Sequence, residues 1–180
     1  MPTAFTHAFA GLALGKVYAG ERRPARFWVL SALCPVVPDL DIIGFAFGVR
    51  YGDALGHRGF SHSLLFALLL GCLVTRRYFR EVPPLTRGWW SLALYFAAAT
   101  ASHGLLDALT TGGFGVAFFS PLDNTRYFLP WPVIIVSPIG LGFFSRYGLL
   151  IFKSELLWVW LPSIALAALA VLVRRARRLF

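Results

Sequence analysis

Histidine and aspartate gather in a few short motifs of an otherwise apolar chain. The chain contains four histidines, and all of them fall in these motifs together with three of its aspartates. Neutral imidazole and ionised carboxylate are both ligands for divalent metal ions. The pattern therefore predicts a site for one or two divalent ions. Its candidate ligands are His7, Asp39, Asp41, His57, His62, His103 and Asp107.

The sequence PVVPDLDIIG places two carboxylates, Asp39 and Asp41, inside an apolar stretch that Pro35 and Pro38 interrupt. A charged side chain at the centre of a bilayer costs about 2.5–3.5 kcal/mol on insertion scales, so two of them need partners or a cation. Aspartate is also a good N-cap, and the alternative is that the pair caps a helix that restarts after Pro38.

The sequence SHGLLDALTTGG separates His103 and Asp107 by four residues. On a helix, this spacing puts both side chains on one face, about one turn apart. The pair could then chelate one ion, or the carboxylate could orient the imidazole. A hydrogen bond that only locks two helices together is the alternative.

The sequence GHRGFSHS carries His57 and His62 in front of an apolar run. On a continuous helix the two rings would diverge by about 140°, but the glycines of the motif allow a tight loop in which both can face one point. Ser61 is well placed to cap the helix that follows. Arg58 is a candidate for binding an anionic group, with snorkelling toward the membrane surface as the alternative.

Two weaker signals lie at either side of these motifs. His7, in THAFAG, stands alone on an apolar helix, where a histidine is more often a hydrogen-bonded structural residue than a ligand, and Thr3 or Thr6 could cap that helix. The stretch FFSPLDNTRYFLPW combines Arg126 with several aromatic residues. Arg126 could hold a phosphate or carboxylate, or it could be solvated within an aromatic belt at the membrane surface.

The elements that must position these residues are membrane helices. The chain is 58% hydrophobic and only 14% charged, whereas soluble proteins average about 45–50% apolar and about 25% charged residues. We therefore expect an all-α, polytopic transmembrane bundle with about five spans, forming a single integral membrane domain over residues 1–180. Helices are expected at residues 4–19, 26–48, 61–77, 89–109 and 155–173. Three prolines in residues 128–144 favour a re-entrant or interfacial element there.

The net charge of +9 comes largely from arginines at segment ends. Such clusters are typical of cytoplasmic loops and argue against nucleic acid as the partner. They are Arg22, Arg23 and Arg26, then Arg76, Arg77 and Arg80, then Arg174, Arg175, Arg177 and Arg178. The predicted topology has the N-terminus outside, the C-terminus in the cytoplasm, and every histidine near the outer ends of the helices.

In combination, the motifs resemble those of the LexA-regulated, membrane-bound metal-dependent hydrolases, the YdjM-like family. THAFAG, PDLD, HRGFSHS, the His103–Asp107 element and SPLDNTRYFLPW carry the resemblance, which runs from about residue 3 to residue 140. It implies that the seven candidate ligands hold metal and that Arg58 and Arg126 are the motif arginines. A weak similarity of the His103–Asp107 element to zinc-dependent phospholipase C enzymes implies phosphoester chemistry.

The sequence thus favours a plasma-membrane (inner-membrane) hydrolase that uses a divalent metal, zinc or alternatively manganese. Its expected substrate is a small-molecule or lipid-linked ester or phosphoester, with membrane lipid as the partner. Arg58 and Arg126 would neutralise an anionic substrate, and Asp41 or Asp107 would be the general base. An ion or proton transporter and a structural membrane protein are the alternative functions. The sequence leaves the oligomeric state open.

Overall fold

The computed structural model describes residues 1–19, 23–138 and 146–177, and this part of the chain is built from helices and irregular segments. The expected all-α class is confirmed, since β-pairing in the described residues is limited to two isolated bridges. The α-helices are α1 (Ala4–Tyr18), α2 (Ala25–Leu33), α3 (Leu64–Tyr78), α4 (Arg87–Ala108), α5 (Arg146–Glu155) and α6 (Leu161–Ala176). Shorter helical elements are the 3₁₀ helices η1 (Val37–Phe47) and η2 (Phe60–His62) and the π-helical turn η4 (Leu156–Trp160).

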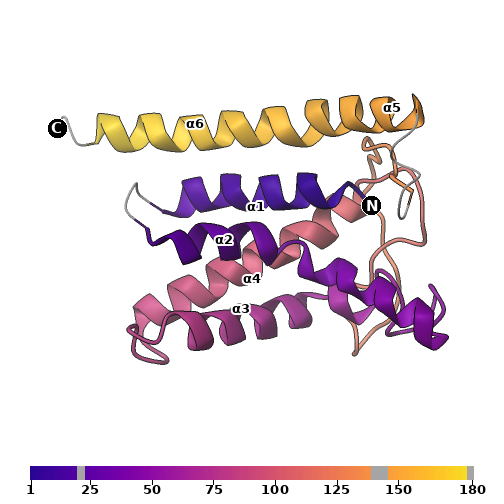
Figure 1. Ribbon diagram of the computed structural model, residues 1–180, viewed down its shortest axis with the longest axis horizontal. Coiled ribbons are helices and arrows are strands. Elements are labelled where there is room, and N and C mark those ends of the chain that lie inside the picture. The colour runs from indigo at the N-terminus through magenta and orange to yellow at the C-terminus, as the bar shows by residue number, and fades with distance from the viewer. Residues whose placement is uncertain (20–22, 139–145, 178–180) are drawn as a thin grey trace.

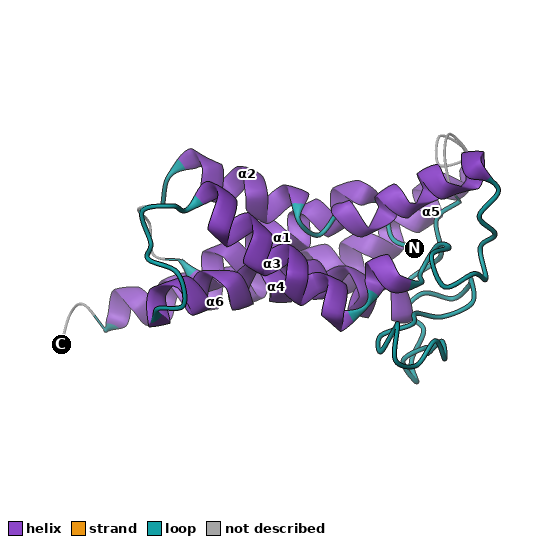
Figure 2. Ribbon diagram, turned by 90° about the horizontal axis from the view of Figure 1, so that it is seen from below, coloured by secondary structure: helices purple, strands orange, loops and turns teal. Residues whose placement is uncertain are grey.

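The helices lie roughly side by side, with α3 packed on α4 and α1 packed between α2, α4 and α6 (Figure 1). Close packing depends on small residues. A Cβ atom at Gly11 would lie 2.1 Å from the carbonyl oxygen of Ser31, and one at Gly71 would lie 2.3 Å from that of Ala93. Irregular segments gather beside the N-terminus at one end of the bundle (Figure 2). This arrangement brings the N-terminal half of α1 to the same end as the loops that carry the chemical motifs.

The helix expected over residues 26–48 is broken. The α2 helix ends at Leu33 and η1 follows after a short turn, with a bend of 47° between the two. Pro35 and Pro38 explain the break, because proline removes a backbone donor and clashes with the preceding turn. The bend turns Asp39 away from the line of α2 and into the protein, where it is buried.

The third helix begins at Leu64, later than expected, because its cap is Ser63 and not Ser61. The Ser63 hydroxyl accepts a hydrogen bond from the backbone N–H of Phe66. Ser61 instead donates to the carboxylate of Asp41. Thr3 caps the first helix, which confirms one of the two predicted caps, Thr3 and Thr6.

The proline-rich segment is extended where the structure describes it, over residues 128–138. Its backbone bonds to the loop that follows α4: Leu129 donates to Ala108, Ile134 donates to Leu109, and Thr111 donates to Ile134. The rest of the expected re-entrant or interfacial element, residues 139–145, lies outside the described residues, as do Arg22 and Arg178. The described part therefore supports the end of α4, which carries Asp107, and the loop after it, which carries Thr110.

Five separate spans are not confirmed. Within the described residues, one continuous helix, Arg146–Ala176, is long and apolar enough to cross a membrane, and α2 with η1 passes the same test as a bent pair. The α1 and α3 helices have 15 residues each, which corresponds to about 22 Å against a hydrocarbon core of about 30 Å. The last helix is longer than expected, since it begins at Arg146 and not near residue 155.

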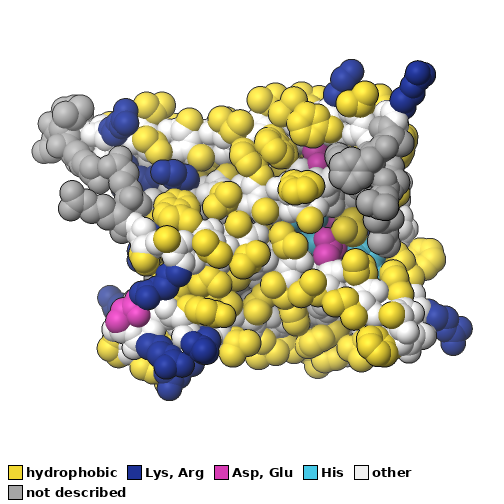
Figure 3. All heavy atoms as spheres, in the orientation of Figure 1, with side chains coloured by type: hydrophobic (Ala, Val, Ile, Leu, Met, Phe, Trp, Pro, Cys, Tyr) yellow, Lys and Arg dark blue, Asp and Glu magenta, His cyan; other side chains and the backbone are white. Residues whose placement is uncertain are grey.

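Charge is distributed unequally between the two ends of the bundle. Figure 3 shows most of the visible Lys and Arg side chains at the end of the bundle where α1 and α3 terminate, and the visible His side chains toward the other end. The main aromatic core, around Phe27, Tyr95 and Phe96, belongs to the arginine-rich half. An apolar layer therefore separates the His/Asp motifs from the arginine clusters at the opposite end.

Candidate metal centre

All seven predicted ligands lie in one buried cluster formed by four elements: α1, η1, the loop that ends in η2, and α4. The cluster contains two groups with metal-ligand spacing, in each of which one ligand atom per residue lies within 4.8 Å of the others. The groups are His7, His103 and Asp107, and Asp39, His57 and His62. Asp41 belongs to neither group. Residues far apart in the sequence are thus combined into two adjoining sets of nitrogen and oxygen ligands.

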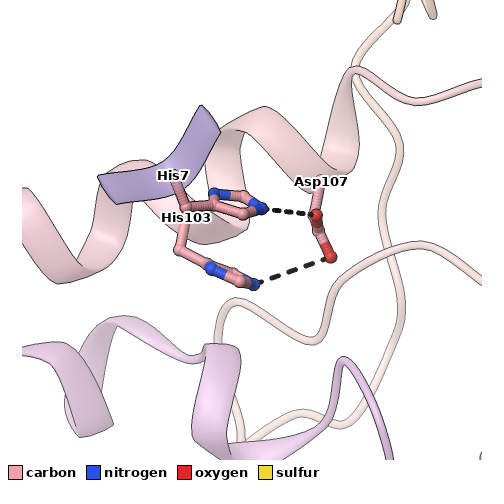
Figure 4. Close-up of side chains that lie close together, drawn as sticks. All are labelled: His7, His103 and Asp107. Carbon is pink, nitrogen blue, oxygen red and sulfur yellow. Dashed lines mark ion pairs between the residues drawn. The ribbon is translucent and has the colours of Figure 1, made fainter. Parts of the chain in front are cut away.

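In the first group, the rings of His7 and His103 are stacked, with centroids 3.7 Å apart. Both rings present Nε2 to the carboxylate of Asp107 (Figure 4). His7 Nε2 lies 3.5 Å from Oδ1, and His103 Nε2 lies 3.8 Å from Oδ2. The helical spacing of His103 and Asp107 therefore places them on one face, as the sequence predicts.

The position of the proton on His103 follows from its contact with the turn between α2 and η1. Its Nδ1 lies 2.6 Å from the carbonyl oxygen of Pro35. A carbonyl oxygen only accepts hydrogen bonds, so Nδ1 carries the proton. In the neutral ring, Nε2 then presents a lone pair to the cluster. A histidine whose outer nitrogen is fixed in this way is typical of metal ligands.

Asp41 fixes the other two imidazoles. Its Oδ1 accepts from Nδ1 of His57 at 2.8 Å, and its Oδ2 accepts from the Ser61 hydroxyl at 2.6 Å. Because Ser61 uses its only proton there, its oxygen can only accept from Nδ1 of His62, which lies 2.9 Å away. Nδ1 carries the proton in both histidines, and Nε2 remains the free nitrogen of each neutral ring.

As a result, the Nε2 atoms of His62 and His103 face each other at 3.0 Å. With both rings neutral, neither atom has a proton to donate, so two lone pairs repel each other unless a cation lies between or beside them. Two ligands of one tetrahedral zinc ion lie about 3.4 Å apart for bonds of about 2.1 Å. Here Asp39 Oδ1 lies 3.3 Å from His103 Nε2 and 3.8 Å from His62 Nε2. The ligand atoms thus have the mutual spacing of one metal coordination sphere.

Several of these atoms lack any hydrogen-bond partner among the described residues. They are both ring nitrogens of His7, both carboxylate oxygens of Asp39, and Oδ1 of Asp107. Leaving buried polar atoms unpaired costs about 1–3 kcal/mol each, and more for charged groups. The unpaired atoms point to an absent binding partner, and their chemistry fits a divalent cation.

Arg58 is completely buried beside the cluster. Its Nε donates to Oδ2 of Asp107 at 2.9 Å, Nη1 donates to the carbonyl of Gly112 at 2.8 Å, and Nη2 donates to the Thr110 hydroxyl at 2.9 Å. All three nitrogens are therefore occupied by protein groups. Arg58 neutralises Asp107 and ties the loop after α4 to the HRGFSHS motif.

Two backbone positions make this arrangement of Arg58 sterically feasible. Arg58 itself has a φ angle of 64°, which side-chain-bearing residues rarely adopt. Gly113 has a φ angle of 94°, and a Cβ atom there would lie 2.5 Å from Nη1 of Arg58. Gly113 is thus required by the close approach of the guanidinium.

Arg126 holds the loop that carries His57 and Tyr51. Its Nη1 donates to the carbonyl of His57 at 2.9 Å, and Nη2 donates to the carbonyls of Tyr51 and Asp53, each at 3.1 Å. Its Nε–H donates to none of the described residues, and its side chain is only partly buried. Nearby, hydrogen bonds from Thr125 hold the pKa of the Asp123 carboxyl below its ordinary value.

A pocket of about 350 Å³ adjoins the cluster, with His57 as part of its wall. The lining is mainly apolar and includes Tyr51, Val136 and Tyr147. Burial raises the pKa of the Tyr51 hydroxyl, whose ring packs edge-on against His57 with centroids 5.1 Å apart. The pocket gives an apolar group access to one side of the candidate ligands.

Sequence reasoning missed three groups that organise the centre. In the sequence, Thr110 stood out only as a threonine after the His103–Asp107 element. Pro35 was noted only because it interrupts an apolar stretch, which gave no sign that its carbonyl would accept a hydrogen bond. Tyr51 had no local signal, because its relation to His57 depends on the loop geometry. The glycines after Thr111 were the one available hint of a close approach.

Comparison with known proteins relates the chain to inner membrane proteins. The model of the YdjM inner membrane protein family matches residues 1–179. Inner membrane protein YbcI of Escherichia coli (strain K12) is 42% identical over 170 residues, which cover 92% of this chain and 95% of that protein. No solved structure matches the chain. The chain therefore belongs to the YdjM family of inner membrane proteins, and the resemblance inferred from its motifs is confirmed.

Proposed function

We propose that this protein is an inner-membrane, metal-dependent hydrolase that cleaves an ester or phosphoester of a lipid-linked substrate. The observation that carries the proposal is the pair of Nε2 atoms of His62 and His103, which lie 3.0 Å apart with their protons fixed on the outer nitrogens. Buried carboxylate oxygens without hydrogen-bond partners in the described residues surround this pair. A divalent cation relieves the repulsion and satisfies the oxygens at the same time.

Six residues would hold the metal: His7, His103 and Asp107 on one side, and Asp39, His57 and His62 on the other. Asp39 is within 4 Å of ligand nitrogens from both groups, so one or two ions fit this donor set. The histidine-rich set favours zinc, with manganese as the alternative. Asp41 would act on the metal through His57 and His62, whose rings it orients.

A bound zinc ion would polarise the scissile group and lower the pKa of water toward 7. The protein would orient the ligands and accept the proton that the attacking water loses. Of the two predicted bases, Asp107 is better placed than Asp41. Oδ1 of Asp107 has no hydrogen-bond partner among the described residues, whereas both oxygens of Asp41 accept hydrogen bonds.

The two motif arginines differ in what they could offer an anionic substrate. Arg58 is completely buried and each of its nitrogens donates to Asp107, Gly112 or Thr110, so we expect its charge to reach the substrate only through the local field. Arg126 keeps its Nε–H free of the described residues and is partly exposed. We therefore assign substrate binding to Arg126 and the orientation of Asp107 to Arg58.

A lipid-linked substrate agrees with the surroundings of the centre. The pocket beside His57 is mainly apolar, and α5 next to it exposes apolar side chains, among them Leu149 and Phe152. In the proposed topology, the multi-pass chain has its N-terminus outside and its C-terminus in the cytoplasm, which puts the centre near the outer membrane surface. A transporter would need ionisable groups along the depth of the bundle, but the opposite half is built around Phe27, Tyr95 and Phe96.

The test is metal analysis of the full-length protein purified in detergent without chelator. We expect zinc or manganese at a ratio of about one or two ions per chain, and loss of the metal in a His57→Ala, His62→Ala double variant. Tyr18→Phe is a control, because it removes the hydrogen bond to Ser91 in the arginine-rich half. A folded wild type without metal above background would overturn the mechanism and leave the transport and structural functions.

With metal established, phospholipids and short-chain esters or phosphoesters would be compared as substrates. Cleavage that is reduced in Arg126→Gln, while the amount of bound zinc stays unchanged, supports the proposed role of Arg126 in substrate binding. Retention of the metal with no cleavage of any member of either class would restrict the protein to a metal-binding function.

A further inference from the structure

The last helix carries a buried carboxylate that belongs to none of the metal-binding motifs. Glu155, at the end of α5, is 1% exposed. Its Oε1 accepts a hydrogen bond from the backbone N–H of Thr3 at 2.6 Å. Its Oε2 accepts from the hydroxyls of Thr3 at 2.7 Å and Thr6 at 2.6 Å. One side chain thus binds both threonines in the first turn of α1.

Trp160 reaches the same threonine from the other end of the π-helical turn. Its indole N–H donates to the Thr6 hydroxyl oxygen at 2.7 Å, and its ring stacks on Phe9 with centroids 4.3 Å apart. In a regular α-helix, Glu155 and Trp160 would point about 140° apart. The turn η4 (Leu156–Trp160) has i to i+5 hydrogen bonding, so residues five apart come nearly above one another. The π turn therefore allows both side chains to face α1.

The residue that follows Thr6 is His7, and it is held differently from the other candidate ligands. His57, His62 and His103 each have an acceptor at Nδ1 that orients the ring. Neither nitrogen of His7 has a hydrogen-bond partner among the described residues. Its ring is positioned by the backbone of α1, by stacking on His103 and by the approach of its Nε2 to Oδ1 of Asp107 at 3.5 Å. Whatever fixes the first turn of α1 therefore fixes this ligand.

We propose that Glu155 is a positioning residue for His7, acting through Thr6 with the help of Trp160, and that the last helix is in this way part of the metal centre. The inference rests on the proposed function, since it requires that His7 binds metal. The charge of Glu155 also suits its place, because a carboxylate at a helix N-terminus interacts favourably with the helix dipole. His7 lacks a hydrogen-bond acceptor that orients its ring, and Glu155 instead fixes the backbone that carries His7.

The experiment measures the zinc affinity of the full-length protein in detergent by competition with a chelator. Glu155→Ala should bind zinc 10–100-fold more weakly, the range found for other residues that orient metal ligands. The zinc affinity of Glu155→Gln should lie between those of the wild type and Glu155→Ala. Its amide can accept a hydrogen bond from a hydroxyl, but it also places a donor near the N–H of Thr3. Tyr18→Phe is the matched control, since it removes a hydrogen bond from the other end of α1 and should leave zinc affinity unchanged.

A double-variant comparison separates positioning from a general loss of stability. If Glu155 acts through His7, adding Glu155→Ala to His7→Ala should weaken zinc binding no further. Losses that add in full, or a folded Glu155→Ala variant with wild-type affinity, would overturn the inference while the metal site stands. Absence of zinc from the wild type would overturn the proposed function as well. If Glu155→Ala does not fold, Thr6→Val carries the same test.

Discussion

The two ends of the helical bundle carry charge in opposite ways. At the arginine-rich end the charged groups are near the surface: Arg26 pairs with Glu81, and these side chains are 47% and 56% exposed. Arg174 donates to the backbone carbonyl of Val17. At the other end, His7, His103 and Asp107 are completely buried and contact one another. The charged groups are thus exposed at one end and buried at the other.

Exposed and buried charges are stabilised in different ways. Exposed arginines are solvated, and each ion pair among them contributes little. Buried ionisable groups require partners at fixed positions, since removing one partner leaves the other charge uncompensated. We therefore expect substitutions at the His/Asp end to affect both stability and metal binding, and those at the arginine end to affect neither strongly.

The largest effect is expected for Asp107→Asn. The change leaves the buried guanidinium of Arg58 without its counter-charge and removes the carboxylate, a proposed metal ligand, that contacts both His7 and His103. The free energy of unfolding should fall by about 3–5 kcal/mol, the usual cost of breaking a buried ion pair, and bound zinc should be lost. Denaturant unfolding in detergent and metal analysis would measure the two effects. Asp123→Asn, an exposed aspartate, is the control, and equal effects of the two substitutions would refute the comparison.

Removal of the metal should lower the free energy of unfolding through the His/Asp end of the bundle. Zinc that binds only the folded state should raise the free energy of unfolding by about 2.7 kcal/mol when its free concentration is a hundred times the Kd. A chelator should reverse the increase, and the His57→Ala, His62→Ala variant should show none. Thermal unfolding followed with and without zinc tests this prediction. An increase of the same size in the double variant would show that zinc binds elsewhere.

A smaller effect is expected for Asp41→Asn, because Asp41 orients two ligands without belonging to either group. Zinc affinity should fall about 10–100-fold, while the number of ions bound at saturation stays the same. Chelator competition measures the affinity, and metal analysis at excess zinc measures the stoichiometry. A loss of stoichiometry would instead identify Asp41 as a direct ligand, as the sequence alone predicts.

The smallest effect is expected for Arg26→Gln at the opposite end. Loss of the exposed pair with Glu81 should change the free energy of unfolding by less than about 1 kcal/mol. Zinc affinity should be unchanged. The single variant and a double variant that also carries Glu81→Gln should be nearly equally stable. A change in zinc affinity would mean that the two ends are coupled through the apolar layer between them.

Local patterns in the sequence predicted a large part of this structure. The fold class follows from composition, and the face shared by His103 and Asp107 follows from helical spacing. The break near Pro35 and Pro38 was visible as a signal, yet the helix was expected to continue through it, because the apolar run around the prolines is long enough for a span. The start of the third helix was expected at residue 61, three residues before Leu64, since apolar composition does not show where a loop ends.

The sequence by itself determined which residues can do chemistry here: all four histidines and three aspartates, set in an apolar chain. Only the tertiary structure decided their roles. It turned Asp41 into the partner of two imidazoles, directed Arg58 onto Asp107, and placed Glu155 on the first turn of α1. The physical reason is that residue type and helical spacing are local properties. Hydrogen-bond partners of buried groups depend on which distant elements pack together, and no local pattern records that.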